Sequence, residues 1–151
     1  MEYTLETLEV YLMAEEFSAP VWNFIQEWDS FKKDTIGKQL ARAADSISAN
    51  IAEGYGRYFY KKSKQFYFYA RGSIQETKAW LSTCKRRKII EAIEVDTLLL
   101  KADGLLFKLN AYIKFVAASP KHNRKPNQPL PPNPLIAQLN KHGKKQNKSW
   151  F

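Results

Sequence analysis

Apolar residues recur at alternating intervals of four and three along four stretches of the chain, and this spacing constrains the fold more than any other feature. The last stretch, from Val95 to Val116, follows it without a fault, and the others cover residues 10–28, 36–51 and 66–84. Intervals of four and three place side chains on one face of a helix, whereas a strand alternates every second residue. The spacing predicts an all-α protein, an antiparallel up-down-up-down four-helix bundle.

Each stretch also predicts which side chains form the core. The four core lines, in chain order, are Val10, Ala14, Phe17, Val21, Phe24 and Trp28; Ile36, Leu40, Ala43, Ile47 and Ile51; Phe66, Ala70, Ser73, Thr77, Leu81 and Cys84; and Val95, Leu99, Ala102, Leu106, Leu109, Ile113 and Val116. On the last helix a second line (Leu98, Leu105, Tyr112) makes the apolar face wider than a small bundle needs. A face that wide predicts burial against another subunit.

Proline, aspartate and glycine mark the expected helix boundaries. Pro20 interrupts the first helical pattern and predicts a kink or a local restart, with Ser18 as the cap of the restarted helix. Asp34 is expected to cap the second helix, since its carboxylate can accept from the first free amide groups. Gly54 and Gly56 are expected to end that helix, because glycine adopts positive φ at little cost.

Length and cysteine content indicate one intracellular domain. A chain of 151 residues is about one domain long. The acidic start, MEYTLETLEV, lacks the cationic and apolar regions of a signal peptide, and no apolar run approaches the roughly 20 residues of a membrane span. Cys84 is the only cysteine, so no disulfide can form within the chain. We therefore expect a soluble, cytoplasmic protein.

The net charge of +9 is unevenly distributed along the chain. Residues 120–151 hold seven Lys or Arg and no acid, and six of the seven prolines lie between Pro120 and Pro134. This composition predicts a bundle over residues 1–119, followed by a largely disordered basic tail over residues 120–151. Within the tail, Leu135, Ile136 and Leu139 could form a docking turn, and Trp150–Phe151 a terminal anchor.

Inside the predicted bundle, one helix is acidic and another basic. Residues 1–31 contain seven acids and no Lys or Arg, whereas residues 57–88 contain ten cations and one acid. Five of these cations lie seven residues apart, and they form one stripe because seven residues drift only about 20° around a helix. The predicted nucleic-acid-binding residues are this stripe, two tyrosines beside it and neighbouring cations: Arg57, Tyr60, Lys61, Lys64, Tyr67, Arg71, Lys78, Lys85, Arg86, Arg87 and Lys88.

Cations that follow a phosphate backbone, with tyrosines that stack on bases, are typical of sequence-tolerant binding to RNA or DNA. The alternative is that the acidic first helix neutralises the stripe, within the subunit or across an interface. The chain would then be a structural or protein-interaction module without nucleic-acid binding.

Catalysis, metals and cofactors find little support in the sequence. Both histidines, His122 and His142, lie in the predicted tail, so no Glu-x-x-His metal motif falls in the bundle. Cys84 falls on a core line and is expected to be a buried filler. Glu53 and Glu76 could act as an acid–base pair only if they converged, and pairing of Glu53 with Arg57 at i,i+4 is the favoured interpretation. We expect no enzyme, no metal and no cofactor.

Two segments, QLARAADSISANIAEGYGR and FYFYARGSIQETKAWL, carry a family resemblance. They resemble the four-helix-bundle proteins first noticed as reading frames inside intervening sequences of bacterial 23S ribosomal RNA genes. That family is similar to the accessory variability determinant (Avd) proteins of diversity-generating retroelements. The resemblance covers Leu8 to Val116. The residues that match the family pattern are Arg42, Ser46, Asn50, Ile51, Ala52, Glu53, Gly54, Gly56, Arg57, Arg71, Gly72, Ser73 and Glu76.

The resemblance implies a four-helix bundle that assembles as a barrel-like homopentamer. For the retroelement members it implies that a basic surface binds nucleic acid and a reverse transcriptase, and for the ribosomal-insertion members it implies no settled activity. Together with the basic stripe, it leads us to expect a non-catalytic, oligomeric accessory protein that binds RNA or DNA. In this role Arg42, Ser46, Asn50 and Glu53 would make polar contacts within the bundle or between subunits.

Overall fold

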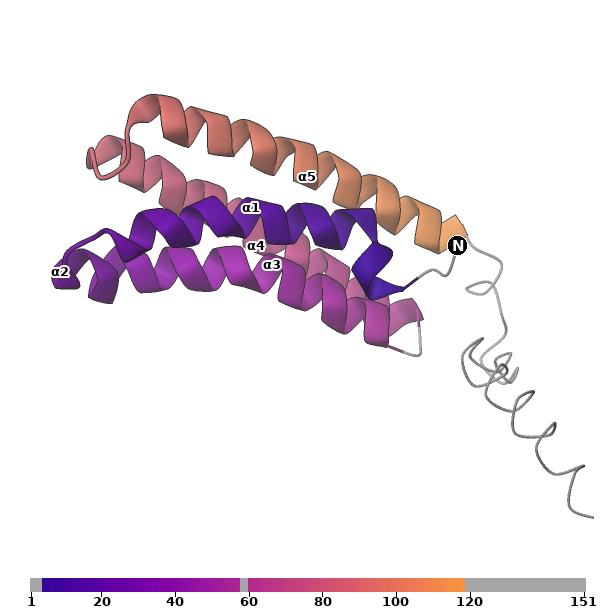
Figure 1. Cartoon of the computed structure of the whole chain (residues 1–151). Helices are drawn as coiled ribbons and strands as arrows, with labels where there is room; N and C mark the ends of the chain where they lie inside the picture. The colour runs from indigo at the N-terminus through magenta and orange to yellow at the C-terminus, as the bar shows by residue number, and fades with distance from the viewer. Residues whose placement is uncertain (1–3, 58–59, 119–151) are drawn as a thin grey trace, which may run out of the picture. The chain divides into compact units, whose positions relative to one another are not determined.

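Four long helices make up most of the described part of the protein (Figure 1). The computed structural model describes residues 4–57 and 60–118. The helices are α1 (Glu9–Gln26), α3 (Lys38–Gly56), α4 (Tyr60–Arg86) and α5 (Ala92–Ala118), and a short 3₁₀ turn, η1 (Leu5–Thr7), precedes α1. The predicted all-α four-helix bundle is confirmed. The division into a bundle and a basic tail stays a prediction, because residues 119–151 lie outside the described part.

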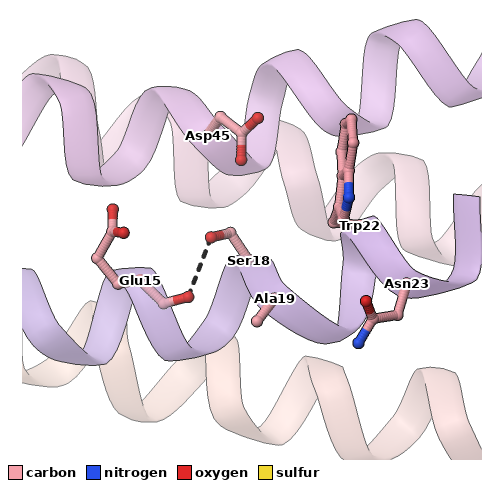
Figure 2. A pocket seen from close by; sticks show the side chains of 6 residues that line it. All are labelled: Glu15, Ser18, Ala19, Trp22, Asn23 and Asp45. Atoms are coloured by element: carbon pink, nitrogen blue, oxygen red, sulfur yellow. Dashed lines mark hydrogen bonds between the residues drawn. The ribbon is translucent and has the colours of Figure 1, made fainter. Parts of the chain in front are cut away.

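α1 continues through Pro20 as one helix. Its buried side chains are Val10, Ala14, Phe17, Val21 and Ile25. The predicted core line is therefore right as far as Val21 and then moves to Ile25, while Phe24 is half-buried. The Ser18 hydroxyl donates to the Glu15 carbonyl at 3.1 Å (Figure 2). Ser18 thus bonds backwards within an unbroken helix, and the predicted restart capped by Ser18 is wrong.

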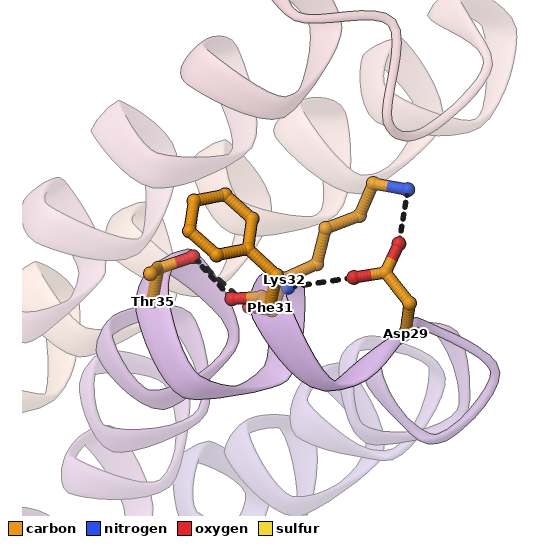
Figure 3. Close-up of polar contacts among 4 residues, drawn as sticks. All are labelled: Asp29, Phe31, Lys32 and Thr35. Atoms are coloured by element: carbon orange, nitrogen blue, oxygen red, sulfur yellow. Dashed lines mark hydrogen bonds and ion pairs between the residues drawn. The ribbon is translucent and has the colours of Figure 1, made fainter.

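The second helical segment starts earlier than predicted, at α2 (Ser30–Lys32), and passes through a π-helical turn, η2 (Lys33–Gly37), into α3. Asp29 is its cap: one carboxylate oxygen accepts from the Lys32 amide at 2.9 Å, and the other pairs with Lys32 Nζ at 2.9 Å (Figure 3). The amide and ammonium of Lys32 lower the pKa of Asp29. The predicted cap, Asp34, lies inside the turn and pairs with Lys38 at 3.6 Å instead.

α3 packs against both α1 and α4. All five residues of its predicted core line are buried, and it ends at Gly56 as expected. The reason for glycine at position 54 differs from the prediction, since no glycine in the described residues has a positive φ. A Cβ at Gly54 would lie 2.6 Å from Cε1 of Tyr67. Glycine here makes room for an aromatic ring from α4.

On α4 and α5 some of the buried residues lie one position away from the residues that were predicted to be buried. The buried residues of α4 are Ser63, Tyr67, Ala70, Ile74, Thr77, Leu81 and Cys84. Phe66 and Ser73, which were expected in the core, are only half-buried. The buried residues of α5 are Val95, Leu98, Ala102, Leu105, Leu109 and Ile113. Four of these belong to the predicted main line, while Leu98 and Leu105 come from the second line. Leu99 and Leu106, which were expected in the core, flank it.

None of the helices in the described ranges combines the length and the apolar character that crossing a membrane requires.

Candidate nucleic-acid interface

The predicted cationic stripe lies along one flank of α4, beside α5. Three of its cations face polar side chains of that helix. Lys85 Nζ lies 2.7 Å from Asp96 Oδ1, and Lys78 Nζ lies 2.5 Å from Asp103 Oδ1. The Arg71 guanidinium donates to Asn110 Oδ1 at 3.4 Å. Over part of its length, the stripe therefore faces polar side chains of α5.

These three contacts form a ladder with a fixed register. Each step of seven residues forward along α4 is matched by a step of seven backward along α5, as expected for antiparallel helices. Within the subunit, the residues that neutralise Lys78 and Lys85 therefore come from α5 and not from the acidic α1. The signal was present in the sequence, because Asp96, Asp103 and Asn110 are themselves seven apart. Exposed ion pairs of this kind contribute about 0.2–1 kcal/mol each to the free energy of unfolding.

The amino-terminal half of α4 presents a different surface. Lys61, Lys64, Phe68 and Arg71 are spaced by three and four residues and so share one face of the helix. Phe68 is 38 % exposed. Lys64 Nζ lies 5.4 Å from the centre of the Phe68 ring, and the Arg71 guanidinium carbon lies 4.7 Å from it. No carboxylate in the described residues pairs with any of these three cations.

Tyr67, one of the two predicted stacking tyrosines, does not form part of that surface. Tyr67 is 2 % exposed, its ring packs edge-on against Tyr112 with centroids 5.2 Å apart, and the two hydroxyls lie 3.4 Å apart. A ring enclosed in this way has no free face for a base, so the assignment of Tyr67 is wrong. Tyr60 is half-buried. The exposed aromatic residues of α4 are Phe68 and Tyr69, which sequence reasoning missed.

The remaining predicted cations lie near the two ends of α4. Arg57 follows α3 and pairs with Glu53, as predicted, and its guanidinium carbon lies 4.7 Å from the Phe66 ring centre. Arg86, Arg87 and Lys88 are exposed at the carboxyl-terminal end of α4, where Arg86, the last residue of the helix, donates to Thr83 Oγ1 at 3.0 Å. Lys62, which was not among the predicted site residues, is also exposed.

The residues of the family pattern lie partly in the core and partly at the surface. Asn50 and Ser46 are half-buried on α3, and Arg42 is exposed. Gly56 has open space where a Cβ would stand. Ser73 donates to the Tyr69 carbonyl at 3.1 Å, and Glu76 accepts from Trp80 Nε1 at 3.4 Å.

The three groups considered for catalysis are buried or already paired: Cys84, Glu53 and Glu76. Burial raises the pKa of the Cys84 thiol to about 11, against a smaller opposing effect of Arg87. Cys84 is 0 % exposed, so its prediction as a core residue is confirmed. Among the described residues, no group of three or more His, Cys, Asp or Glu side chains is arranged to hold a metal ion.

Comparisons with known proteins support this architecture. A family model described as 23S rRNA-intervening sequence protein matches residues 6–111. A crystal structure of a protein of unknown function from the S23 ribosomal protein family of Bacteroides thetaiotaomicron has a similar fold. Its TM-score is 0.63 at 22 % identity, over 70 % of this chain and 98 % of that chain. Among curated proteins, no match was found.

Proposed function

Because the chain belongs to the family of 23S rRNA-intervening sequence proteins, we propose that it is a non-catalytic, oligomeric accessory protein that binds RNA or DNA through the amino-terminal half of α4. One observation carries the proposal. Lys61, Lys64 and Arg71 have no carboxylate partner in the described residues, and Lys64 and Arg71 lie over the ring of Phe68, which is 38 % exposed. Cations beside an exposed aromatic ring suit a strand whose phosphates are neutralised while a base stacks.

The dimensions of this face fit a short segment of nucleic acid. From Lys61 to Arg71 the helix rises about 15 Å, at about 1.5 Å per residue. One strand of duplex DNA advances about 3.4 Å per nucleotide, so the face spans roughly four nucleotides. Every base offers a π-face to Phe68, so this binding would be tolerant of sequence.

Two further groups of cations would extend the binding surface. Arg86, Arg87 and Lys88 lie at the other end of α4 and have no ion pair within the described part of the chain. The basic segment 120–151 would add seven positive charges if it contacts phosphates. In an oligomer, repeated weak sites would reinforce one another by raising the effective local concentration. We propose a homopentamer on the family resemblance, and a reverse transcriptase as the partner if the chain is a retroelement member.

The second candidate is a protein-interaction module, and the ladder between α4 and α5 favours it. Lys78 and Lys85 already pair with aspartates of α5, so the cations in the carboxyl-terminal half of α4 link two helices of the bundle. If the same were true of the whole helix, charge reversal at Lys64 would weaken folding or assembly and leave nucleic acid unaffected.

A mobility-shift titration decides between the two candidates. The probe is an unstructured single-stranded RNA of about 20 nucleotides, tested beside a DNA duplex at 50 and 200 mM salt. With three phosphate contacts and a slope of about −0.7 per contact, affinity for the RNA should fall about 20-fold between these conditions. The Lys61→Glu/Lys64→Glu variant should bind at least tenfold more weakly at 50 mM salt.

Lys33→Glu is the matched control, because Lys33 is also an exposed helical cation without an ion pair in the described residues. It should bind within about twofold of wild type. Absence of binding by wild-type protein, or equal binding by the double variant, would reject the proposed interface in favour of the interaction module.

A further inference from the structure

α5 carries a second apolar seam that faces away from the core. Ile93, Leu100 and Phe107 lie seven residues apart and are 75 %, 73 % and 73 % exposed. Between them lies Gly104, where a Cβ would meet nothing within 4 Å. Large side chains that repeat every seven residues along an exposed helix are typical of a helix–helix interface. This seam was not among the predicted core lines, and it differs from the wide inner face of the same helix.

The surface between α1 and α3 is hollowed and carries carboxylates, in contrast to the projecting apolar side chains of the α5 seam. A hollow of about 430 Å³ is lined by small residues, Ser18 and Ala19, and by the half-exposed ring of Trp22 (Figure 2). Glu15 and Asp45 also line this hollow. Burial and the negative charge of Glu15 raise the pKa of Asp45. Within the described residues neither carboxylate has a cation as partner, so the hollow is a negatively charged site with an aromatic wall.

The seam of α5 has the complementary charge. Lys101 follows Leu100 and is exposed, without an ion pair among the described residues, and Lys108 follows Phe107 and pairs with Glu9 at 3.1 Å. Glu94 follows Ile93 in the same way, so an antiparallel pair of α5 helices would place Glu94 against Lys108 but leave Lys101 against the Lys101 of the other copy. Like charges at an interface oppose association. The α1/α3 hollow instead offers two carboxylates to Lys101 and the Trp22 ring to the large apolar side chains.

We infer that the α5 seam of one copy docks on the α1/α3 face of a second copy, with Leu100 and Phe107 against Ala19 and Trp22, and Lys101 beside Glu15 and Asp45. This inference rests on the oligomer of the proposed function and deepens it by naming the two surfaces. Because the surfaces differ, the contact is heterologous, and such contacts repeat around a ring until it closes.

A charge-swap experiment on the full chain tests this docking, with mass in solution measured by light scattering over a dilution series. Lys101→Glu and Glu15→Lys should each raise the dissociation constant at least tenfold. The double variant Glu15→Lys/Lys101→Glu should return to within about threefold of wild type, because the reversed charges again attract. Leu100→Ser should give monomers. Phe31→Ser is the control: Phe31 is 77 % exposed but lies on α2, outside both surfaces, and its variant should keep the wild-type mass.

The outcomes separate the docking from the proposed function. An oligomer that Leu100→Ser and Lys101→Glu leave intact would overturn these surfaces while preserving the oligomer. Failure of the double variant to recover, with circular dichroism showing a folded bundle, would overturn the pairing of Lys101 with Glu15. A monomeric wild type would reject the oligomer and the docking together. The Lys61→Glu/Lys64→Glu variant should keep the wild-type mass, so its nucleic-acid binding, measured separately by mobility shift, reports on the α4 interface independently of the docking.

Discussion

The two halves of α4 carry the same stripe of cations but meet different neighbours. In the carboxyl-terminal half, Lys78 and Lys85 face aspartates of α5. In the amino-terminal half, Lys64 and Arg71 lie over Phe68 and meet no carboxylate in the described residues. The antiparallel register explains the difference, since it places Asn110 opposite Arg71. A regular stripe of charge therefore does not define a binding surface until the opposite helix is known.

The largest expected effect tests whether Tyr67 belongs to the core or to the binding surface. Tyr67→Ala should lower the free energy of unfolding by about 3–5 kcal/mol, because it removes a buried ring that packs over Gly54 and against Tyr112. Urea denaturation followed by circular dichroism measures the loss, and Tyr67→Phe, which keeps the ring, should lose far less. A Tyr67→Ala protein of wild-type stability that fails to bind RNA would restore the original stacking assignment.

Phe68 should behave in the opposite way. Phe68→Ala should leave the free energy of unfolding within about 1 kcal/mol of wild type, since the ring is substantially exposed. It should weaken RNA binding about tenfold, because stacking of one base contributes about 1–3 kcal/mol. Mobility shift and urea denaturation of the same preparation check both effects. Unchanged RNA affinity would remove Phe68 from the interface.

Charge reversal in the carboxyl-terminal half should affect stability more than binding. Lys78→Glu places a carboxylate beside Asp103 and should cost about 1 kcal/mol of unfolding free energy. RNA affinity should stay within about twofold. Lys64→Glu should show the reverse pattern, with wild-type stability and weaker binding. If both variants lose binding equally, the stripe acts as one surface.

Chemical labelling of Cys84 offers a local measurement of the difference between the two halves of α4. With the pKa of the buried thiol raised to about 11, only about 0.1 % is thiolate at pH 8, so alkylation should require opening of this part of the bundle. Because the reaction passes through an opened state, the rate should rise with pH up to the ordinary thiol pKa of about 8.5 and level off above it. Lys78→Glu should accelerate alkylation at pH 8, and Lys64→Glu should not. Equal acceleration in both variants would contradict a local role for the ladder.

The smallest expected effect comes from releasing the ladder cations. Asp96→Asn/Asp103→Asn frees Lys85 and Lys78 at a cost below about 1 kcal/mol for each pair. If the freed cations reach phosphates, the slope of log affinity against log salt should steepen by about 0.7–0.9 for each one. Titrations at four salt concentrations measure this slope. An unchanged slope would show that nucleic acid does not reach the carboxyl-terminal half of α4.

Much of the architecture was predictable from spacing alone. The 4-3 pattern located the four long helices, and the core line of α3 was right at every residue. Errors arose where two lines one residue apart were both plausible, as with Leu99 and Leu98 on α5. Periodicity locates an apolar face to within about one residue, but the neighbouring helices decide which line is enclosed.

The candidate site was less predictable than the fold. Tyr67 and Phe68 are adjacent aromatic residues, and about 100° of helix rotation separates a buried ring from an exposed one. Tyr67 is the enclosed ring because Gly54, which lacks a Cβ, leaves space for it against α3.

By itself, the amino-acid sequence determined the helical class, the number of long helices and the position of the cations on one flank of α4, because each follows from local periodicity. Only the tertiary structure decided which of those cations are neutralised, which aromatic ring is enclosed and which face of α5 stays exposed. These properties depend on pairs of residues far apart in the chain, such as Lys78 with Asp103 and Gly54 with Tyr67. Such pairs meet only once the helices have packed in one register.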